Sequence, residues 1–284
     1  MKRFSFSLPA LSVLFLAGCT EHGGGASVVP TVTFIAADAG AAVEGDATGS
    51  EASDAATAAP GRIVGKVTLV GTAPSLPLAV TQGAEIKDKE VCAAIDLPDE
   101  RLLLGEGGGV RNVFVYMQKA PKGTAKPETL PDFVLDQKNC RFEPHCAVLQ
   151  VNQPVKVLSN DSVAHNTHTN PQKNGAVNSG VAPNDREGKL SFSYRKAEVA
   201  PFAVTCDYHS WMRAYHLPLD HPYAAVSDSS GSFTIADVPP GKHVFAVWHE
   251  AVDGNYIERK LSVEVKSGED TDVKIDLPAE KLKL

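Results

Sequence analysis

The sequence lacks the features that mark several common functions. It has no cluster of Lys or Arg, and its formal net charge is −7 over 284 residues. Binding to nucleic acid or to an anionic lipid surface is therefore disfavoured. No Ser-His-Asp order, phosphate-binding loop or paired-carboxylate pattern stands out. The chain is nevertheless 43% hydrophobic, which is enough for one or two compact domains.

A long apolar run is also missing from the N-terminal region. Residues 1–19 carry Lys2 and Arg3 ahead of a short apolar run that ends in "LAGC". The run is too short to span a bilayer stably, and a basic start followed by such a run is typical of an export signal. We therefore expect the protein to leave the cytoplasm.

The "LAGC" ending resembles the lipobox of bacterial lipoproteins, in which the Cys becomes the lipid-modified first residue. The resemblance implies lipidation of Cys19 and a periplasmic or cell-surface lipoprotein that contacts the membrane only through its lipid. The residue that follows, Thr20, favours the outer membrane. An ordinary signal peptide that contains a Cys is the alternative.

Beyond this signal the composition changes twice. Residues 20–60 are rich in Ala, Gly, Ser, Thr and acidic residues and contain one aromatic residue. Such a segment buries too little apolar surface to offset its ordering entropy, so it is predicted to be a flexible tether. From Arg62 onward, short β-rich runs separated by Gly, Pro, Asn and Asp clusters predict an all-β protein with scarce helix. The runs are "RIVGKVTLV", "VRNVFVYM", "AVLQV", "PVKVLS", "KLSFSYR", "PFAVTC", "SFTIA", "KHVFAVWH", "ERKLSVEV" and "DVKIDL", with "TQGAEIKDKEVCAAI" as the best candidate for a helical turn or two.

Two segments of the β-rich region carry metal-ligand residue types. "CDYHSWM" places Cys206, His209 and Met212 at intervals of three, directly after a predicted strand, and "NDSVAHNTH" contributes His165. Two imidazoles, a thiolate and a weak axial thioether form the ligand set of a mononuclear electron-transfer copper site. Copper(II) favours nitrogen and copper(I) favours sulfur, so a mixed set suits both oxidation states. Zinc is the main rival metal, but a thioether is a poor zinc ligand.

The motifs "C-x-x-H-x-x-M" and "H-N-x-H" resemble the type 1 copper loops of cupredoxins, and amicyanin matches their spacing best. The resemblance covers about residues 145–215. It implies that His165, Cys206, His209 and Met212 bind one copper ion and that Asn166 helps to fix the ligand loop. It does not count His168 as a ligand. It also implies that electrons pass through an exposed edge of His209 to a redox protein partner.

A second resemblance concerns the C-terminal region. "DSSGSFTIADVPPGKHVFAVWHE", residues 228–250, looks like the hairpin signature of carboxypeptidase-regulatory or transthyretin-like β-sandwich modules, and "GRIVGKVTLVGTAP" looks like the opening strand of the same module. The whole pattern resembles the cupredoxin-like, methylamine-utilisation-like lipoproteins of bacteria. We predict a cupredoxin-like Greek-key β-sandwich combined with a small transthyretin-like β-sandwich. The expected segments are the signal at 1–19, the tether at 20–60, the module's opening strand at 61–80, the copper domain at 81–221 and the rest of the module at 222–278.

The remaining cysteines predict a disulfide in an oxidising compartment. With Cys19 lipidated and Cys206 on the metal, Cys92, Cys140 and Cys146 are left, and three cannot all pair within one chain. A bridge between Cys92 and Cys140 is preferred, and Cys140 with Cys146 is the alternative.

Three functions are compatible with such a site. The first is electron transfer by type 1 copper, and the second is a non-redox copper module for storage, sensing or delivery. The third is a copper enzyme. A trinuclear oxidase cluster needs many further imidazoles, typically in His-x-His pairs, whereas this chain has nine His and no such pair. We therefore predict a protein that is not an enzyme.

Overall fold

The computed structural model describes residues 58–126 and 129–284. The predicted signal, Cys19 and nearly all of the predicted tether lie outside these residues. The described residues all belong to one compact unit. Within them no helix is long and apolar enough to cross a membrane. Their regular structure is almost entirely β-strand, so the predicted all-β class is confirmed.

Two sheets belong to the C-terminal module. A three-stranded sheet has the order β13-β1-β16, and a four-stranded sheet has the order β12-β2-β14-β15. The bounds are β1 Gly61–Val70, β2 Phe114–Met117, β12 Ala224–Val226, β13 Ser232–Val238, β14 Gly241–Trp248, β15 Tyr256–Val265 and β16 Asp270–Pro278.

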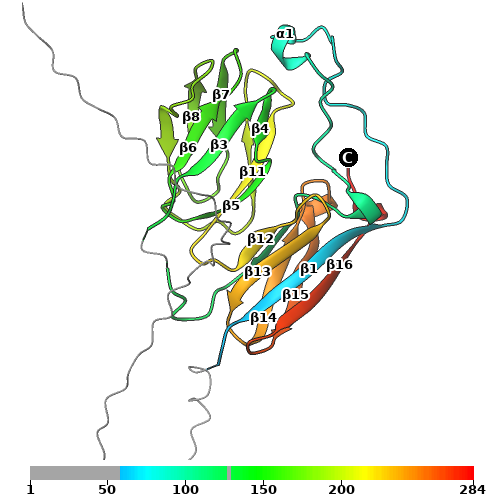
Figure 1. Ribbon diagram of the computed structural model, residues 1–284, viewed down its shortest axis with the longest axis vertical. Coiled ribbons are helices and arrows are strands. Elements are labelled where there is room, and N and C mark those ends of the chain that lie inside the picture. The colour runs from blue at the N-terminus through cyan, green and yellow to red at the C-terminus, as the bar shows by residue number, and fades with distance from the viewer. Residues whose placement is uncertain (1–57, 127–128) are drawn as a thin grey trace, which may run out of the picture. The chain divides into compact units, whose positions relative to one another are not determined.

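The opening strand β1 lies between two C-terminal strands. It pairs antiparallel with β13 and parallel with β16, and Figure 1 shows the blue β1 between the gold β13 and the red β16. The chain between them is therefore an insertion in the module. Strand β2 falls in the segment expected to form the copper domain, yet it pairs with β12 and β14 of the module.

The inserted residues form two further sheets. A five-stranded sheet has the order β5-β11-β10-β7-β8, and a four-stranded sheet has the order β4-β3-β6-β9. We call this pair of sheets the ligand sandwich. The bounds are β3 Phe133–Lys138, β4 Arg141–Glu143, β5 Cys146–Gln150, β6 Val155–Ser159, β7 His165–Thr169, β8 Asn178–Val181, β9 Leu190–Phe192, β10 Phe202–Thr205 and β11 Arg213–Leu219.

The ligand sandwich follows a period of two along its strands. In β6, Val155, Val157 and Ser159 are buried while the residues between them are partly exposed, and β-branched residues suit such a pleated, half-buried surface. The buried residues include Leu135, Phe142, Val204 and two of the candidate ligands, Cys206 and Met212. The metal-binding residue types are therefore part of the hydrophobic core.

Helices are short. The one α-helix among the described residues is α1, Lys89–Cys92, with three 3-10 turns, η2 Glu106–Gly108, η3 Asp253–Asn255 and η4 Ala279–Lys281. Helix α1 lies in residues 79–101, which we call the strap. The two ends of the strap pair through Val80 and Leu97, where the Leu97 N–H donates to the Val80 carbonyl at 2.8 Å. The strap also has its own small hydrophobic cluster, formed by Val80, Ala93 and Leu97.

Candidate metal centre

Three of the four predicted ligands meet at one point. The Nδ1 atoms of His165 and His209 lie 3.0 Å apart, and the Sγ atom of Cys206 lies 4.0 Å from the first and 3.8 Å from the second. Both imidazoles have no exposed surface, and Cys206 is 3% exposed. Three buried donor atoms thus form a triangle large enough to surround one ion at about 2.0 Å from nitrogen and about 2.3 Å from sulfur.

Strand β7 and the loop after β10 bring these residues together. His165 begins β7, which is antiparallel to β10, and Cys206 directly follows β10. The loop then closes on itself, because the Cys206 N–H donates to the Met212 carbonyl at 3.3 Å and the Met212 N–H donates to the His209 carbonyl at 3.0 Å. A closed loop fixed to one strand can hold Cys206 and His209 against a histidine of the next strand.

The fourth predicted ligand, Met212, is 1% exposed and packs in the same cluster as Cys206. The donor atoms that converge come from His165, Cys206 and His209. An axial role for the Met212 thioether therefore stays a prediction.

The electrostatics of the donor group favour a thiolate. Burial alone raises the pKa of the Cys206 thiol, but contacts with His165 and His209 and backbone N–H groups outweigh it and lower the pKa to about 6. The His165 ring changes in the opposite direction, since Asp161 and Cys206 outweigh burial and raise its pKa to about 8. A thiolate at neutral pH is the form that binds a metal ion.

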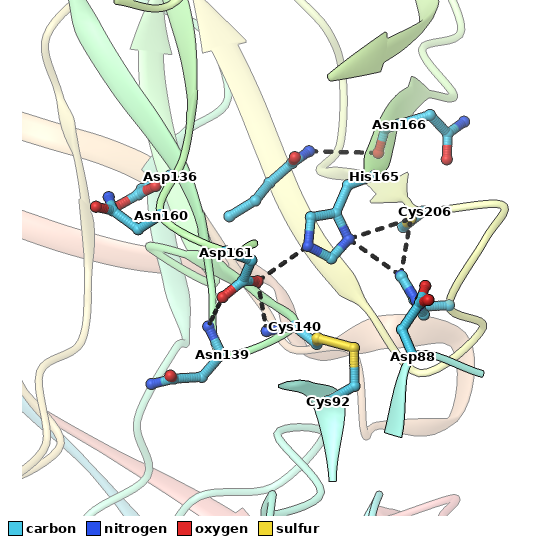
Figure 2. A network of polar contacts seen from close by, with 12 residues as sticks. Asp88, Cys92, Asp136, Asn139, Cys140, Asn160, Asp161, His165, Asn166 and Cys206 are labelled. Atoms are coloured by element: carbon cyan, nitrogen blue, oxygen red, sulfur yellow. Dashed lines mark hydrogen bonds and ion pairs between the residues drawn. A yellow bond between two sulfur atoms is a disulfide. The ribbon is translucent and has the colours of Figure 1, made fainter. Parts of the chain in front are cut away.

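Asp161 holds the His165 ring from behind. Its Oδ2 atom lies 2.9 Å from His165 Nε2, and its two oxygens accept the backbone N–H groups of Asn139 and Cys140 at 2.7 and 2.8 Å. Figure 2 shows the carboxylate between the ring and the Asn139–Cys140 turn. A proton on Nε2 donated to Asp161 leaves the Nδ1 lone pair directed at the donor group, which is how ligating histidines are usually oriented.

Asp88 does the same for His209, but from the strap. Its Oδ2 atom lies 2.9 Å from His209 Nε2 across 121 positions of sequence. Asp88 has φ 57 and ψ 34, a left-handed conformation that Asp tolerates better than most residues. Ile86 and Trp211 pack against the strap cluster, and the Lys87 ammonium lies 4.5 Å from the Tyr208 ring centre. The strap therefore covers the ligand loop by hydrogen bonding, apolar packing and a cation–π contact.

The strap corrects one prediction. The His209 ring edge was expected to be exposed, but the ring is fully buried. Trp211 packs on it with ring centres 5.2 Å apart and donates its N–H to the Cys140 carbonyl at 3.2 Å. The ligand that was expected to face a redox partner instead faces Asp88 and Trp211.

Asn166 links the two ligand-bearing segments. Its Oδ1 atom accepts the Asp207 N–H at 2.6 Å, and its Nδ2 atom donates to the Asp207 carboxylate at 2.9 Å. It thus connects the residue after His165 to the residue after Cys206. His168 lies outside the donor group, with its Nδ1 atom 3.0 Å from Asp207.

A disulfide anchors the strap beside the donor group. It joins Cys92 to Cys140, the pairing preferred from the sequence, and leaves Cys146 and Cys206 as free buried cysteines. Figure 2 shows the bridge below Asp161 and to the left of Asp88. Because the Cys140 N–H also donates to Asp161, the disulfide and the His165 support share one turn.

Sequence reasoning did not find Asp161, Asp88 or the strap. Asp161 stands four residues before His165, inside the quoted "NDSVAHNTH", so a carboxylate next to a metal-ligand histidine was an available signal. No such signal pointed to Asp88, because it is far from His209 in the sequence.

Comparisons with known proteins found a matching family model and several similar solved structures. The family that matches is "Polysaccharide lyase family 4, domain II", over residues 194–273, which begins in the ligand sandwich and ends in the C-terminal module. This description differs from the carboxypeptidase-regulatory or transthyretin-like resemblance of the hairpin. No curated protein matches the chain.

Solved cupredoxins are among the similar structures. Amicyanin from Paracoccus versutus is 10% identical with a TM-score of 0.26, over 38% of this chain and 99% of that one. A purple cupredoxin from Nitrosopumilus maritimus is 16% identical with a TM-score of 0.25, over 31% and 99%. A Cu-containing nitrite reductase from Thermus scotoductus is 15% identical with a TM-score of 0.28, and the match covers 36% of this chain and a quarter, 25%, of the reductase. At such scores the likeness says nothing about function.

Proposed function

We propose that the protein is a type 1 copper electron-transfer protein. The observation that carries this proposal is the buried triangle of His165 Nδ1, His209 Nδ1 and Cys206 Sγ. The donor set fits copper because it combines two imidazoles with a thiolate of lowered pKa and a buried thioether nearby. Copper in such a site cycles between two oxidation states with little change in its surroundings.

Each residue of the proposed copper site has its own role. The Cys206 thiolate and the two Nδ1 atoms hold the ion, and the Met212 thioether is the proposed axial ligand. Asp161 and Asp88 accept the Nε2 protons and so fix both rings in the ligating tautomer. Asn166 keeps the two ligand segments in register. Burial excludes water, which would otherwise add ligands to the ion.

The proposal also covers where the protein acts and which kind of protein it meets. Export and lipidation at Cys19 would hold the folded residues near a membrane, on the periplasmic or cell-surface side, with the outer membrane favoured by Thr20. A soluble or membrane redox protein would exchange the electrons. These parts rest on the "LAGC" motif and on the ligand set.

The test is a visible and electron paramagnetic resonance spectrum of the purified protein loaded with Cu(II). We expect strong thiolate-to-copper absorption and a narrow parallel hyperfine splitting, both lost in Cys206→Ser. Cys146→Ser is the matched control, because Cys146 is the other free cysteine in the described part of the chain and is also buried. A colourless complex, or absorption that survives in Cys206→Ser, would exclude a type 1 site.

The burial of His209 favours a second candidate. With the strap over the ring there is no exposed ligand edge for direct electron exchange, which suits a module that stores or delivers copper without redox turnover. Voltammetry and chelator competition distinguish the two candidates. Reversible reduction with copper retained supports electron transfer, whereas irreversible reduction with transfer of copper to the chelator supports storage or delivery.

A further inference from the structure

A cavity of about 340 Å³ lies beside the ligand loop. Its walls come from the strap, from the first residues of β4 and β11, from His145 between β4 and β5, from the turn after β14 and from the ligand loop. Among the lining residues are Leu97, Arg141, His145, Trp211 and Glu250. The volume is at the lower end of the range for small-molecule sites, which occupy roughly 300–1,000 Å³.

Two buried donors in the cavity wall have no hydrogen-bond partner among the described residues. They are the Nε atom of Arg141 and the Nδ1 atom of His145. The His145 side chain is 5% exposed, and its Nδ1 lies 3.6 Å from Glu100 Oε2, an ion-pair separation that is too long for a hydrogen bond. Unpaired buried polar atoms are rare in folded proteins, because each one loses its water without compensation.

The acidic groups of the cavity are already occupied. Asp99 is bound by Arg101, and Glu100 lies against Arg141 and His145. Glu250 contacts His145 through Nε2. A third arginine, Arg213, also lines the cavity and forms no ion pair with any described residue. The groups left over are therefore donors, and they suit an anion rather than a cation.

The charge of His145 supports this assignment. Burial lowers the pKa of its ring, but Glu100 and Glu250 outweigh burial and raise the pKa to about 9. The ring is therefore protonated at neutral pH, and both of its nitrogens donate.

Part of the cavity lining is apolar. It includes Ala79, Leu97, Pro98 and Trp211. We propose that the cavity binds a small organic carboxylate, with its charged end beside Arg141, His145 and Arg213 and its apolar body against Leu97 and Trp211. This site goes beyond the proposed electron transfer and needs no metal, so it can be tested in the metal-free protein.

The experiment is isothermal titration calorimetry of the purified full chain with benzoate, benzyl alcohol and sulfate, before and after copper loading. Benzoate carries both proposed features, benzyl alcohol lacks the charge and sulfate lacks the apolar body. We expect benzoate to bind in both metal states and more tightly than the other two probes.

Three variants locate the binding. Arg141→Gln should weaken benzoate about tenfold, the usual effect of losing a hydrogen bond to a charged group. Ala79→Phe, at an exposed position on the cavity wall, should abolish binding by filling the space without removing a donor. Arg186→Gln, an equal change of charge on an exposed residue elsewhere, should leave it unchanged. Failure of benzoate to bind, sulfate binding as tightly as benzoate, or binding that survives Ala79→Phe would each overturn the proposal.

Discussion

His165 and His209 present the same ring atom to the same point, but different parts of the chain hold them. Each Nε2 lies 2.9 Å from a carboxylate. For His165 that carboxylate is Asp161, four residues earlier, whereas for His209 it is Asp88, in the strap. One half of the site is thus built into the ligand sandwich, and the other half is closed from outside.

The two supports differ in strength. The Asp161 side chain is 5% exposed and also accepts two backbone N–H groups, while the Asp88 side chain is 31% exposed and has His209 as its one side-chain partner among the described residues. A buried carboxylate with three donors is held more firmly than a partly solvated one with one donor. The strap side should therefore open first.

Removal of the strap's covalent anchor should have the largest effect. The Cys92–Cys140 bridge closes a loop with a sequence separation of 48, for which loop-closure entropy predicts about 4 kcal/mol of stability as an upper value. We expect Cys92→Ala with Cys140→Ala to lower the free energy of unfolding by that order, measured in urea. Cys146→Ala is the control for loss of a buried cysteine. A loss no larger than in this control would mean that the strap is held without the bridge.

The sequence predicted the half of the site that is local. The spacing "C-x-x-H-x-x-M" placed Cys206 and His209 in one loop, and "H-N" named His165 and the neighbouring Asn166. These assignments depend on short-range patterns, in which the residue types themselves carry the metal preference. Most of the strands found by alternation, such as β6, β10 and β14, are likewise local features.

The half built by the strap could not be predicted. Asp88 lies in a polar stretch whose only pattern is one helical turn, and its contact with His209 depends on tertiary packing. Strand β7 was also missed, because its sequence "HNTHT" lacks apolar residues. Four of its five residues are nevertheless buried. Buried polar residues with partners supplied from elsewhere do not follow a hydrophobic period.

The second anchor of the strap is the pair Glu100–His145, and it makes stability depend on pH. The His145 pKa is raised to about 9, so its contribution is fully present below the ordinary value of about 6.5 and is lost as the pH rises through about 9. The loss over this window should approach about 3 kcal/mol at most.

Glu100→Gln removes one of the two carboxylates that face the ring and leaves Glu250. We expect the decline to begin at a lower pH and to be smaller in this variant, as urea unfolding at a series of pH values would show. Cys206 and His165 titrate in the same range, but they are present in both proteins, so the difference between the two curves reports His145. Identical curves would contradict the role of Glu100.

The two carboxylates themselves can be compared directly. We expect Asp161→Asn to lower the free energy of unfolding by about 2 kcal/mol and Asp88→Asn by about 1 kcal/mol or less, because the second carboxylate is partly solvated. Affinity for Cu(II) should fall in the same order, by about 10- to 100-fold for Asp161→Asn. Urea unfolding and competition with a chelator measure the two quantities. Equal losses would mean that the strap side is as firmly held as the sandwich side.

The smallest effect concerns the contact of Lys87 with Tyr208. A cation over an exposed aromatic ring contributes about 0.5–1 kcal/mol, so Lys87→Ala should hardly change global stability. Because the contact joins the strap to the ligand loop, its loss should instead favour local opening of the strap. Amide hydrogen exchange should therefore become faster at residues 84–93 and stay unchanged in β7.

The matched control for this change is Arg259→Ala, which removes the same kind of contact from Tyr256 in the C-terminal module, where the guanidinium lies 4.1 Å from the ring centre. It should leave exchange in the strap unchanged. If Lys87→Ala accelerated amide hydrogen exchange in β7 as much as in the strap, the two halves of the site would open together. In that case the division between a fixed half and a closing half would not hold.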